Sequence, residues 1–205
     1  MKKPEKGKKS GLKKAILEWG GILAVMGILY FSGLYTEVLG SMQRAMLWTG
    51  LFNAKVHRVS TADSTKLTDN TYNMTLVTSK GEQVSLKKFK GDVIFINFWA
   101  SWCPPCIAEM PTIAKLYHHV SNYKNIRFLM VSVNKNHQKA ISFMKNKGFP
   151  MSYYFPASAI PKIFQTSLIP STYVISPKGK IIYKKKGVAN YSSDNFRHWL
   201  IKQAR

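Results

Sequence analysis

Residues 93–106 read VIFINFWASWCPPC, an apolar run that ends in two closely spaced cysteines. The apolar run predicts a buried β-strand over 93–99, and residues 107–120 predict a helix after the second cysteine. Unpaired N–H groups at a helix N-terminus stabilise a thiolate, which is the form that attacks disulfides. We therefore expect Cys103 to be the nucleophile of a redox dithiol and Cys106, one turn inside the helix, to be the resolving thiol.

Three other interpretations of the cysteine pair stay open. A structural zinc site needs four ligands, but the chain has only two cysteines and no histidine near the pair. A structural disulfide over so short a loop restricts the unfolded chain little. Two buried packing thiols would not need flanking prolines and a tryptophan. The redox dithiol is therefore favoured over the zinc half-site, the structural disulfide and the buried thiols.

The chain is strongly basic, and the excess lies in two regions. The net charge over 205 residues is +22, with +6 in residues 1–14, zero in 15–71 and +16 in 72–205. A hydrophobic content of 45% is enough for a core. A basic domain favours acidic partners or an anionic membrane surface. Its lysines match no nucleic-acid-binding module, so no nucleic-acid partner is expected.

The N-terminal region resembles a membrane anchor. Seven lysines in residues 1–14 precede an apolar stretch over 15–35, which is long enough for a short membrane span. The positive-inside rule puts residues 1–14 in the cytoplasm and the rest of the chain outside it. An uncleaved signal anchor is favoured because no clear cleavage site follows the stretch, and a cleaved signal peptide or a buried soluble helix is the alternative.

Residues 36–71 predict an amphipathic segment, over 38–54, and then a polar linker. Residues 72–205 predict one domain in which strands alternate with helices before a terminal hairpin and helix. The expected strands are 72–77, 83–86, 93–99, 126–133, 151–155, 171–175 and 180–184, and the expected helices are 107–120, 138–147, 160–166 and 192–204. This order predicts an α/β three-layer sandwich that begins with a β-hairpin.

Two motifs carry a resemblance to a known family. The stretches WASWCPPC, over 99–106, and IPSTYVISPKGKI, over 169–181, resemble thioredoxin-fold proteins of the TlpA/ResA type, and the likeness covers residues 72–205. The resemblance implies a thioredoxin-like fold with an added N-terminal β-hairpin and a central insertion between 134 and 168. It also implies tethering to a bacterial inner (cytoplasmic) membrane by a single span, with the redox domain facing the periplasm or outside.

The resemblance also implies how a partner is held. Pro170 resembles the cis-proline that faces the dithiol in this family, and an ordinary trans-proline is the alternative. The backbone of Ile169 is then expected to bind an extended segment of the partner. Trp102 is expected to cover the cysteines.

An acidic residue is expected to serve the dithiol. Thioredoxins proper keep a buried Asp on the strand before the motif, and Asn97 stands at that position here. In the family that this chain resembles, an acid at the position of Glu109 lies near the dithiol. Burial would raise its pKa and let it exchange the proton of Cys106. An exposed glutamate, or a first-turn acid that stabilises the helix dipole, is the alternative.

The sequence therefore predicts an extracytoplasmic thiol–disulfide oxidoreductase that reduces disulfides in envelope proteins. The resemblance makes apocytochrome c an expected substrate and a membrane thiol donor the expected source of electrons. No cofactor is expected beyond the redox-active Cys103–Cys106 disulfide, and no metal. A thiol oxidase or isomerase would use the same residues, whereas a Cu(I) chaperone or a non-catalytic tethered binding module would be a protein of a different class.

Overall fold

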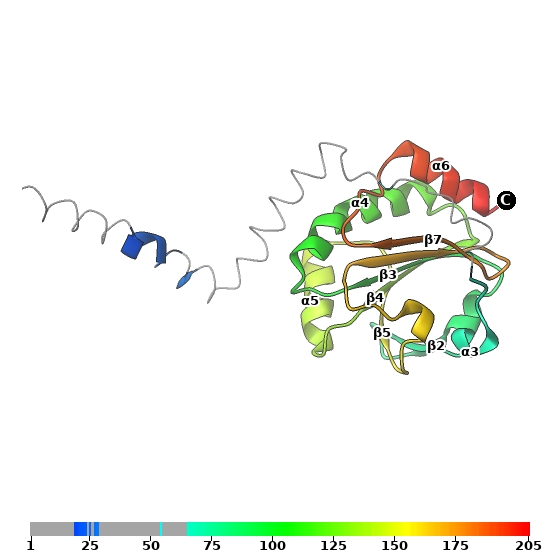
Figure 1. Cartoon of the computed structure of the whole chain (residues 1–205), viewed down its shortest axis with the longest axis horizontal. Coiled ribbons are helices and arrows are strands. Elements are labelled where there is room, and N and C mark those ends of the chain that lie inside the picture. The colour runs from blue at the N-terminus through cyan, green and yellow to red at the C-terminus, as the bar shows by residue number, and fades with distance from the viewer. Residues whose placement is uncertain (1–18, 24, 26, 29–53, 55–64) are drawn as a thin grey trace, which may run out of the picture.

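A seven-stranded mixed sheet forms the centre of the domain (Figure 1). The computed structural model describes residues 19–23, 25, 27, 28, 54 and 65–205. The strands are β1 (Thr75–Thr78), β2 (Gln83–Ser85), β3 (Val93–Trp99), β4 (Ile126–Ser132), β5 (Tyr153–Pro156), β6 (Ser171–Ile175) and β7 (Ile181–Lys186). Their order is β2-β1-β5-β4-β3-β6-β7. β4 is parallel to both β3 and β5, and the other neighbours are antiparallel.

Strand β3 lies inside the sheet, and all seven of its residues are buried. Successive side chains of a strand point to opposite faces. The odd-numbered hydrophobic residues of β3 join one core cluster, and the even-numbered ones join the other. Both faces of this strand are therefore covered, which explains why its sequence is a continuous apolar run.

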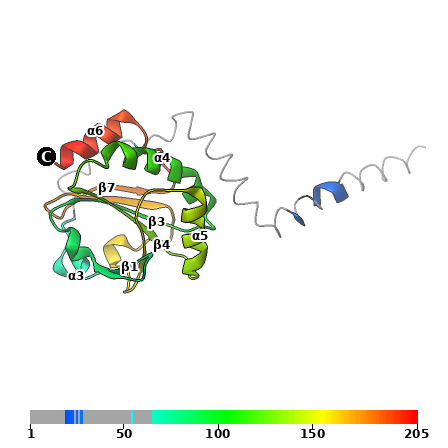
Figure 2. The same ribbon diagram turned by 180° about the vertical axis from the view of Figure 1, so that it is seen from behind.

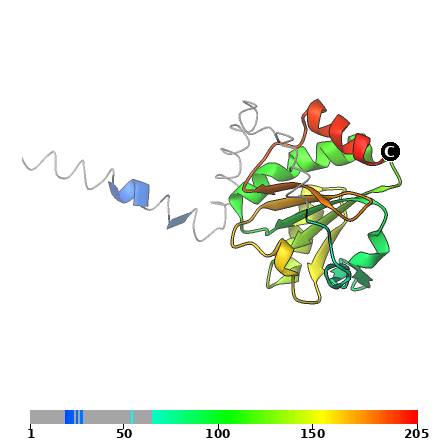
Figure 3. The same ribbon diagram turned by 45° about the vertical axis from the view of Figure 1, so that its right-hand side comes forward.

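Helices and turns cover the two faces of the sheet (Figures 1 and 2). One core cluster receives side chains from α4 (Pro104–Val120), α5 (His137–Lys147) and α6 (Asp194–Gln203). The other receives side chains from α3 (Asp69–Tyr72), η1 (Leu86–Phe89) and η2 (Lys162–Phe164). Figure 3 shows η2 below the sheet, on the side away from α4 and α6. The predicted thioredoxin-like three-layer sandwich, with its β1–β2 hairpin, is confirmed.

The start of the domain differs from the sequence analysis. The sequence predicts a strand over 72–77 after a linker, but Asp69–Tyr72 is the helix α3, and β1 begins only after it. The Thr68 side chain accepts a hydrogen bond from the Thr71 N–H and so caps the helix. Leu67 is buried in the core as well. A helix cap and tertiary burial therefore override the local apolar alternation.

A second difference concerns the predicted helix over 160–166, which is reduced to the 3-10 turn η2. Only Phe164 of η2 is buried, and one buried side chain supports little helix. The remaining elements agree with the sequence analysis to within three residues at each end.

Most of the predicted anchor over 15–35 lies outside the described residues. Those described within it, 19–23, 25, 27 and 28, are helical. Within the part of the chain that the structure describes, no helix is long and apolar enough to cross a membrane. The basic tail and most of the amphipathic segment also lie outside the described residues. Ala54 is described and buried, and its N–H donates to the Asn190 carbonyl at 2.8 Å.

The end of α5 depends on the backbone of Gly148. This residue caps the helix at φ 63° and ψ 30°, a left-handed conformation that glycine adopts easily. An added Cβ would meet no heavy atom within 4 Å, so the replacement costs conformational energy alone. Gly148→Ala is therefore expected to lower the free energy of unfolding by about 1–2 kcal/mol. Urea unfolding measures this loss, and an unchanged midpoint would contradict the expectation.

Candidate active site

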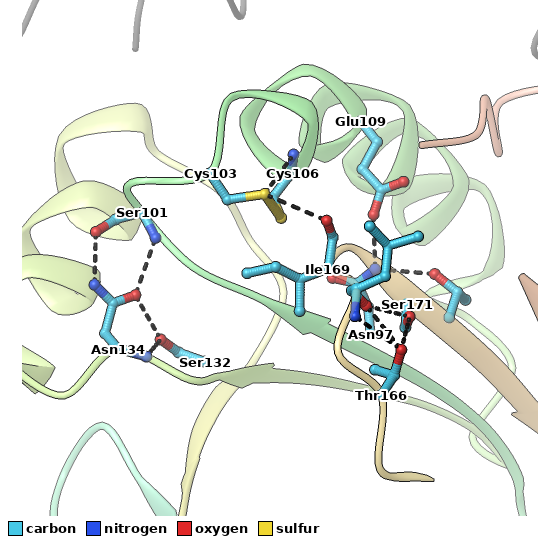
Figure 4. The surroundings of a disulfide bond; sticks show 12 residues. Asn97, Ser101, Cys103, Cys106, Glu109, Ser132, Asn134, Thr166, Ile169 and Ser171 are labelled. Carbon is cyan, nitrogen blue, oxygen red and sulfur yellow. Dashed lines mark hydrogen bonds between the residues drawn. A yellow bond between two sulfur atoms is a disulfide. The ribbon is translucent and has the colours of Figure 1, made fainter. Parts of the chain in front are cut away.

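The two cysteines lie at the N-terminus of α4 and are joined in a disulfide (Figure 4). Cys103 is the N-cap residue, and its Sγ accepts a hydrogen bond from the Cys106 N–H at 3.3 Å. Pro104 and Pro105 occupy the first helical positions, where the missing N–H of proline does no harm. Cys103 keeps 4% of its surface exposed and Cys106 none. A thiolate on Cys103 would therefore lie at the positive end of the helix dipole and nearer to solvent than Cys106.

The disulfide is suited to exchange rather than to stabilising the chain. Its cysteines are three positions apart, so the closed loop restricts the unfolded chain little. Among the described residues, no three side chains of His, Cys, Asp or Glu lie close enough together to hold a metal ion. The pair can pass between disulfide and dithiol without any other cofactor.

The loop before β6 faces the disulfide. The peptide bond between Ile169 and Pro170 is cis, as the family resemblance implies. Figure 4 shows the Ile169 carbonyl pointing toward the disulfide. Its oxygen lies 3.8 Å from the Cys103 Sγ. Trp102 and Leu168 flank this contact in sequence, and their side chains are 55% and 49% exposed. The disulfide thus lies beside two exposed apolar residues and the backbone of Ile169.

Glu109 lies one turn after Cys106 on α4, so the two side chains share a helix face. Only 1% of Glu109 is exposed. The Asn97 Nδ2 donates to its Oε1 at 2.7 Å, and the Ala189 N–H donates to its Oε2 at 3.1 Å. Burial raises the pKa of Glu109 from 4.5 to about 8, while these two hydrogen bonds and Lys185 lower it. The exposed-glutamate alternative is therefore wrong, and Glu109 can exchange a proton near neutral pH.

Several residues that position Glu109 are absent from the sequence analysis. Thr172 Oγ1 accepts a second hydrogen bond from Asn97 Nδ2 at 2.9 Å, and the Thr112 hydroxyl donates to the Glu109 carbonyl at 2.8 Å. Ala189 acts through its backbone from 80 residues away, so its side chain gives no signal in the sequence. Asn97 does give a signal in the sequence, because it is a polar residue inside an apolar strand.

The Asn97 amide is expected to hold down the pKa of Glu109. It donates a hydrogen bond to the carboxylate, and Asn97→Leu removes that donor while keeping the branched shape of the side chain. The pKa of Glu109 is therefore expected to rise above about 8. The pH dependence of the Glu109 side-chain carboxyl ¹³C shift measures it. Thr172→Val is the control because Thr172 contacts Asn97 and not the carboxylate. A lower pKa in Asn97→Leu would contradict the expectation.

A helix-capping dithiol opposite a cis-proline, on a mixed sheet covered on both faces, defines a thioredoxin-fold dithiol protein. The Redoxin family model matches residues 62–197, and the chain belongs to that family. The match begins before residue 72, in agreement with the buried Leu67. The predicted resemblance to the TlpA/ResA type is confirmed at the level of this family and its relatives.

The curated relatives of this chain include two thiol-disulfide oxidoreductases of Bacillus subtilis (strain 168). "Thiol-disulfide oxidoreductase ResA" is 30% identical over 112 residues, which cover 54% of this chain and 62% of that protein. "Sporulation thiol-disulfide oxidoreductase A" is 26% identical over 125 residues, covering 60% and 74%. The chain thus aligns with less than two thirds of ResA. The crystal structure of StoA from Bacillus subtilis has a TM-score of 0.52 at 24% identity, covers 61% of this chain and 93% of that chain, and supports the fold alone.

Proposed function

We propose that this protein is a thiol–disulfide oxidoreductase that reduces disulfides in extracytoplasmic proteins. The observation that carries the proposal is the position of Cys103, which caps α4 and lies 3.8 Å from the Ile169 carbonyl beside a cis-proline. This arrangement gives a thiolate a stabilising helix N-terminus and gives a partner a backbone edge to bind. The names of the two relatives support the same chemistry.

The reaction proceeds by two thiol–disulfide exchanges. The Cys103 thiolate attacks one sulfur of the partner's disulfide, that S–S bond breaks, and the second partner sulfur leaves as a thiolate. Cys106, as thiolate, then attacks the Cys103 sulfur of the mixed disulfide and releases the first partner sulfur. The partner gains two electrons and two protons, and the protein keeps the Cys103–Cys106 disulfide seen in the structure. A thiol donor then reduces that disulfide.

Glu109 accepts the proton of the buried Cys106 thiol. Cys106 is fully buried and must lose a proton before it attacks the mixed disulfide. Glu109 is the buried acid on the next turn of the same helix, and its pKa of about 8 suits exchange with a thiol. The base is thus the ionised carboxylate, and protonated Glu109 gives the proton back to the Cys106 thiolate when the pair is reduced again.

The cellular setting is part of the proposal. Seven lysines before an apolar stretch support an N-terminal anchor with the domain outside the cytoplasm, at a bacterial inner membrane. In that setting the partners are disulfide-containing envelope proteins, with apocytochrome c as one substrate, and a membrane thiol donor. Nucleic acid is not among the partners.

The reduction potential of the Cys103–Cys106 pair tests the direction of transfer. Equilibration of the full chain with thiol buffers, followed by alkylation, measures it. A value near roughly −270 mV or lower supports a reductase. A value near roughly −120 mV would indicate an oxidase, and the cytochrome substrate would be wrong. If no interconversion occurs at any buffer ratio, the redox function itself is wrong, and Cu(I) binding becomes the next hypothesis.

A further inference from the structure

Asn134 joins the end of β4 to the turn that precedes Cys103 (Figure 4). The Ser101 N–H donates to the Asn134 Oδ1 at 2.9 Å, and the Asn134 Nδ2 donates to the Ser101 Oγ at 2.8 Å. The Ser132 hydroxyl donates to the same Oδ1 at 3.0 Å. We call Ser101, Ser132 and Asn134 the Asn134 clamp.

Two of the three clamp residues are buried, and Ser101 is half-buried. Asn134 is 4% exposed and Ser132 is fully buried, so a lost hydrogen bond there would not be replaced easily by water. The Asn134 side chain hydrogen-bonds both the backbone N–H and the side-chain oxygen of Ser101, which fixes the position and the orientation of Ser101 together. Cys103 follows two residues later, and its N–H donates to the Ala100 carbonyl at 3.2 Å. The clamp therefore holds the middle of a turn whose ends are β3 and the α4 cap.

The clamp matters most when the disulfide is open. In the oxidised protein the S–S bond itself ties Cys103 to the first turn of α4. In the dithiol that bond is gone. The Ile107 N–H still donates to the Cys103 carbonyl at 3.0 Å, and the turn before Cys103 is the second restraint that keeps its sulfur at the helix N-terminus. A sulfur that moves away from the Cys106 N–H loses the hydrogen bond and the dipole that favour the thiolate.

We propose that Asn134 is a positioning residue that keeps Cys103 at the N-terminus of α4 in the reduced protein. The proposal rests on the proposed function, because it concerns the attacking form of the dithiol. Asn134 touches neither sulfur in the structure and acts through Ser101.

The test is the pH dependence of alkylation of the reduced full chain by iodoacetamide. Because Cys106 is fully buried, the rate reports mainly on Cys103. Asn134→Ala removes the three side-chain hydrogen bonds of the clamp. A rise of one unit in the thiol pKa would slow alkylation about tenfold at a pH below the wild-type pKa. We expect a slowing of about this size. Ser101→Ala removes only the acceptor for Asn134 Nδ2, so a smaller slowing of about threefold is expected.

Asn125 provides the matched control at the opposite end of β4. Its side-chain amide donates to the Ala204 carbonyl, and it is half-buried. Asn125→Ala is expected to lower stability and leave the alkylation profile unchanged. If Asn134→Ala lowers stability with no change in the profile, as the control does, the clamp is only structural and the proposal is wrong.

Two further outcomes separate the proposal from the proposed function. If Asn134→Ala does not fold, the half-buried Ser101→Ala decides, and a profile equal to that of the wild type overturns the proposal. If the wild type shows no interconversion of dithiol and disulfide in thiol buffers, the redox function is wrong and the positioning role is wrong with it. If the wild type interconverts dithiol and disulfide but the variants keep its alkylation profile, the positioning role of Asn134 is wrong and the redox function stands.

Discussion

Replacing Cys103 with serine is expected to reduce catalysed disulfide reduction to the background rate of the reductant. Cys103 caps α4 and is the more exposed of the two sulfurs. A serine hydroxyl stays protonated at neutral pH and does not attack a disulfide. The loss is expected to be at least about a hundredfold. Reduction of insulin by dithiothreitol, with the full chain as catalyst, measures it.

Cys106→Ser is the matched control for that change. Both variants lose the same disulfide, so they share the change in stability that comes from that bond. Cys106→Ser keeps the nucleophile and lacks the resolving thiol, so it is expected to accumulate a covalent adduct with the substrate. Non-reducing electrophoresis detects the adduct. Formation of the adduct by Cys103→Ser instead would mean that the roles of the two sulfurs are reversed.

The parts of the fold that were predictable are those in which burial alone decides the local structure. The strand β3 is buried on both faces, and its bounds follow from the apolar run. The end of α5 follows from a glycine after a periodic apolar pattern. The helix α3 was not predictable in this way, because it depends on the Thr68 cap and on burial of Tyr72 against distant segments.

The same division holds at the site. Cys103 and Cys106 are recognised from their spacing and context, and Glu109 from the family resemblance. The groups that position these three residues from distant parts of the chain are not recognisable from the sequence. The Ala189 N–H acts on Glu109 from 80 residues away, and Asn134 reaches Ser101 across 33 residues, from the neighbouring strand β4. Such contacts depend on sheet order, which no local motif encodes.

Stability is expected to fall as pH rises from 4.5 to about 8, because folded Glu109 holds a proton that the unfolded chain has released. A carboxyl whose folded pKa is raised gives its full stability below the unfolded pKa and loses it as pH rises through the folded pKa. The shift from 4.5 to about 8 corresponds to a loss on the order of 4 kcal/mol between pH 5 and pH 9. Burial is the main cause of the shift, so replacing the Glu109 carboxyl is the direct test.

Glu109→Gln is expected to remove most of that pH dependence, because the neutral amide cannot lose a proton. Urea unfolding of the oxidised wild type and variant at pH 5 and pH 9, at one ionic strength, gives the two differences in unfolding free energy. Glu82→Gln is the control, because Glu82 is exposed and its replacement removes the same formal charge from the chain. It should follow the wild type at both pH values. An equal loss in Glu109→Gln would mean that Glu109 is ionised throughout this range. The carboxylate would then have an ordinary pKa and be too weak a base to take the Cys106 proton, and another group would have to accept it.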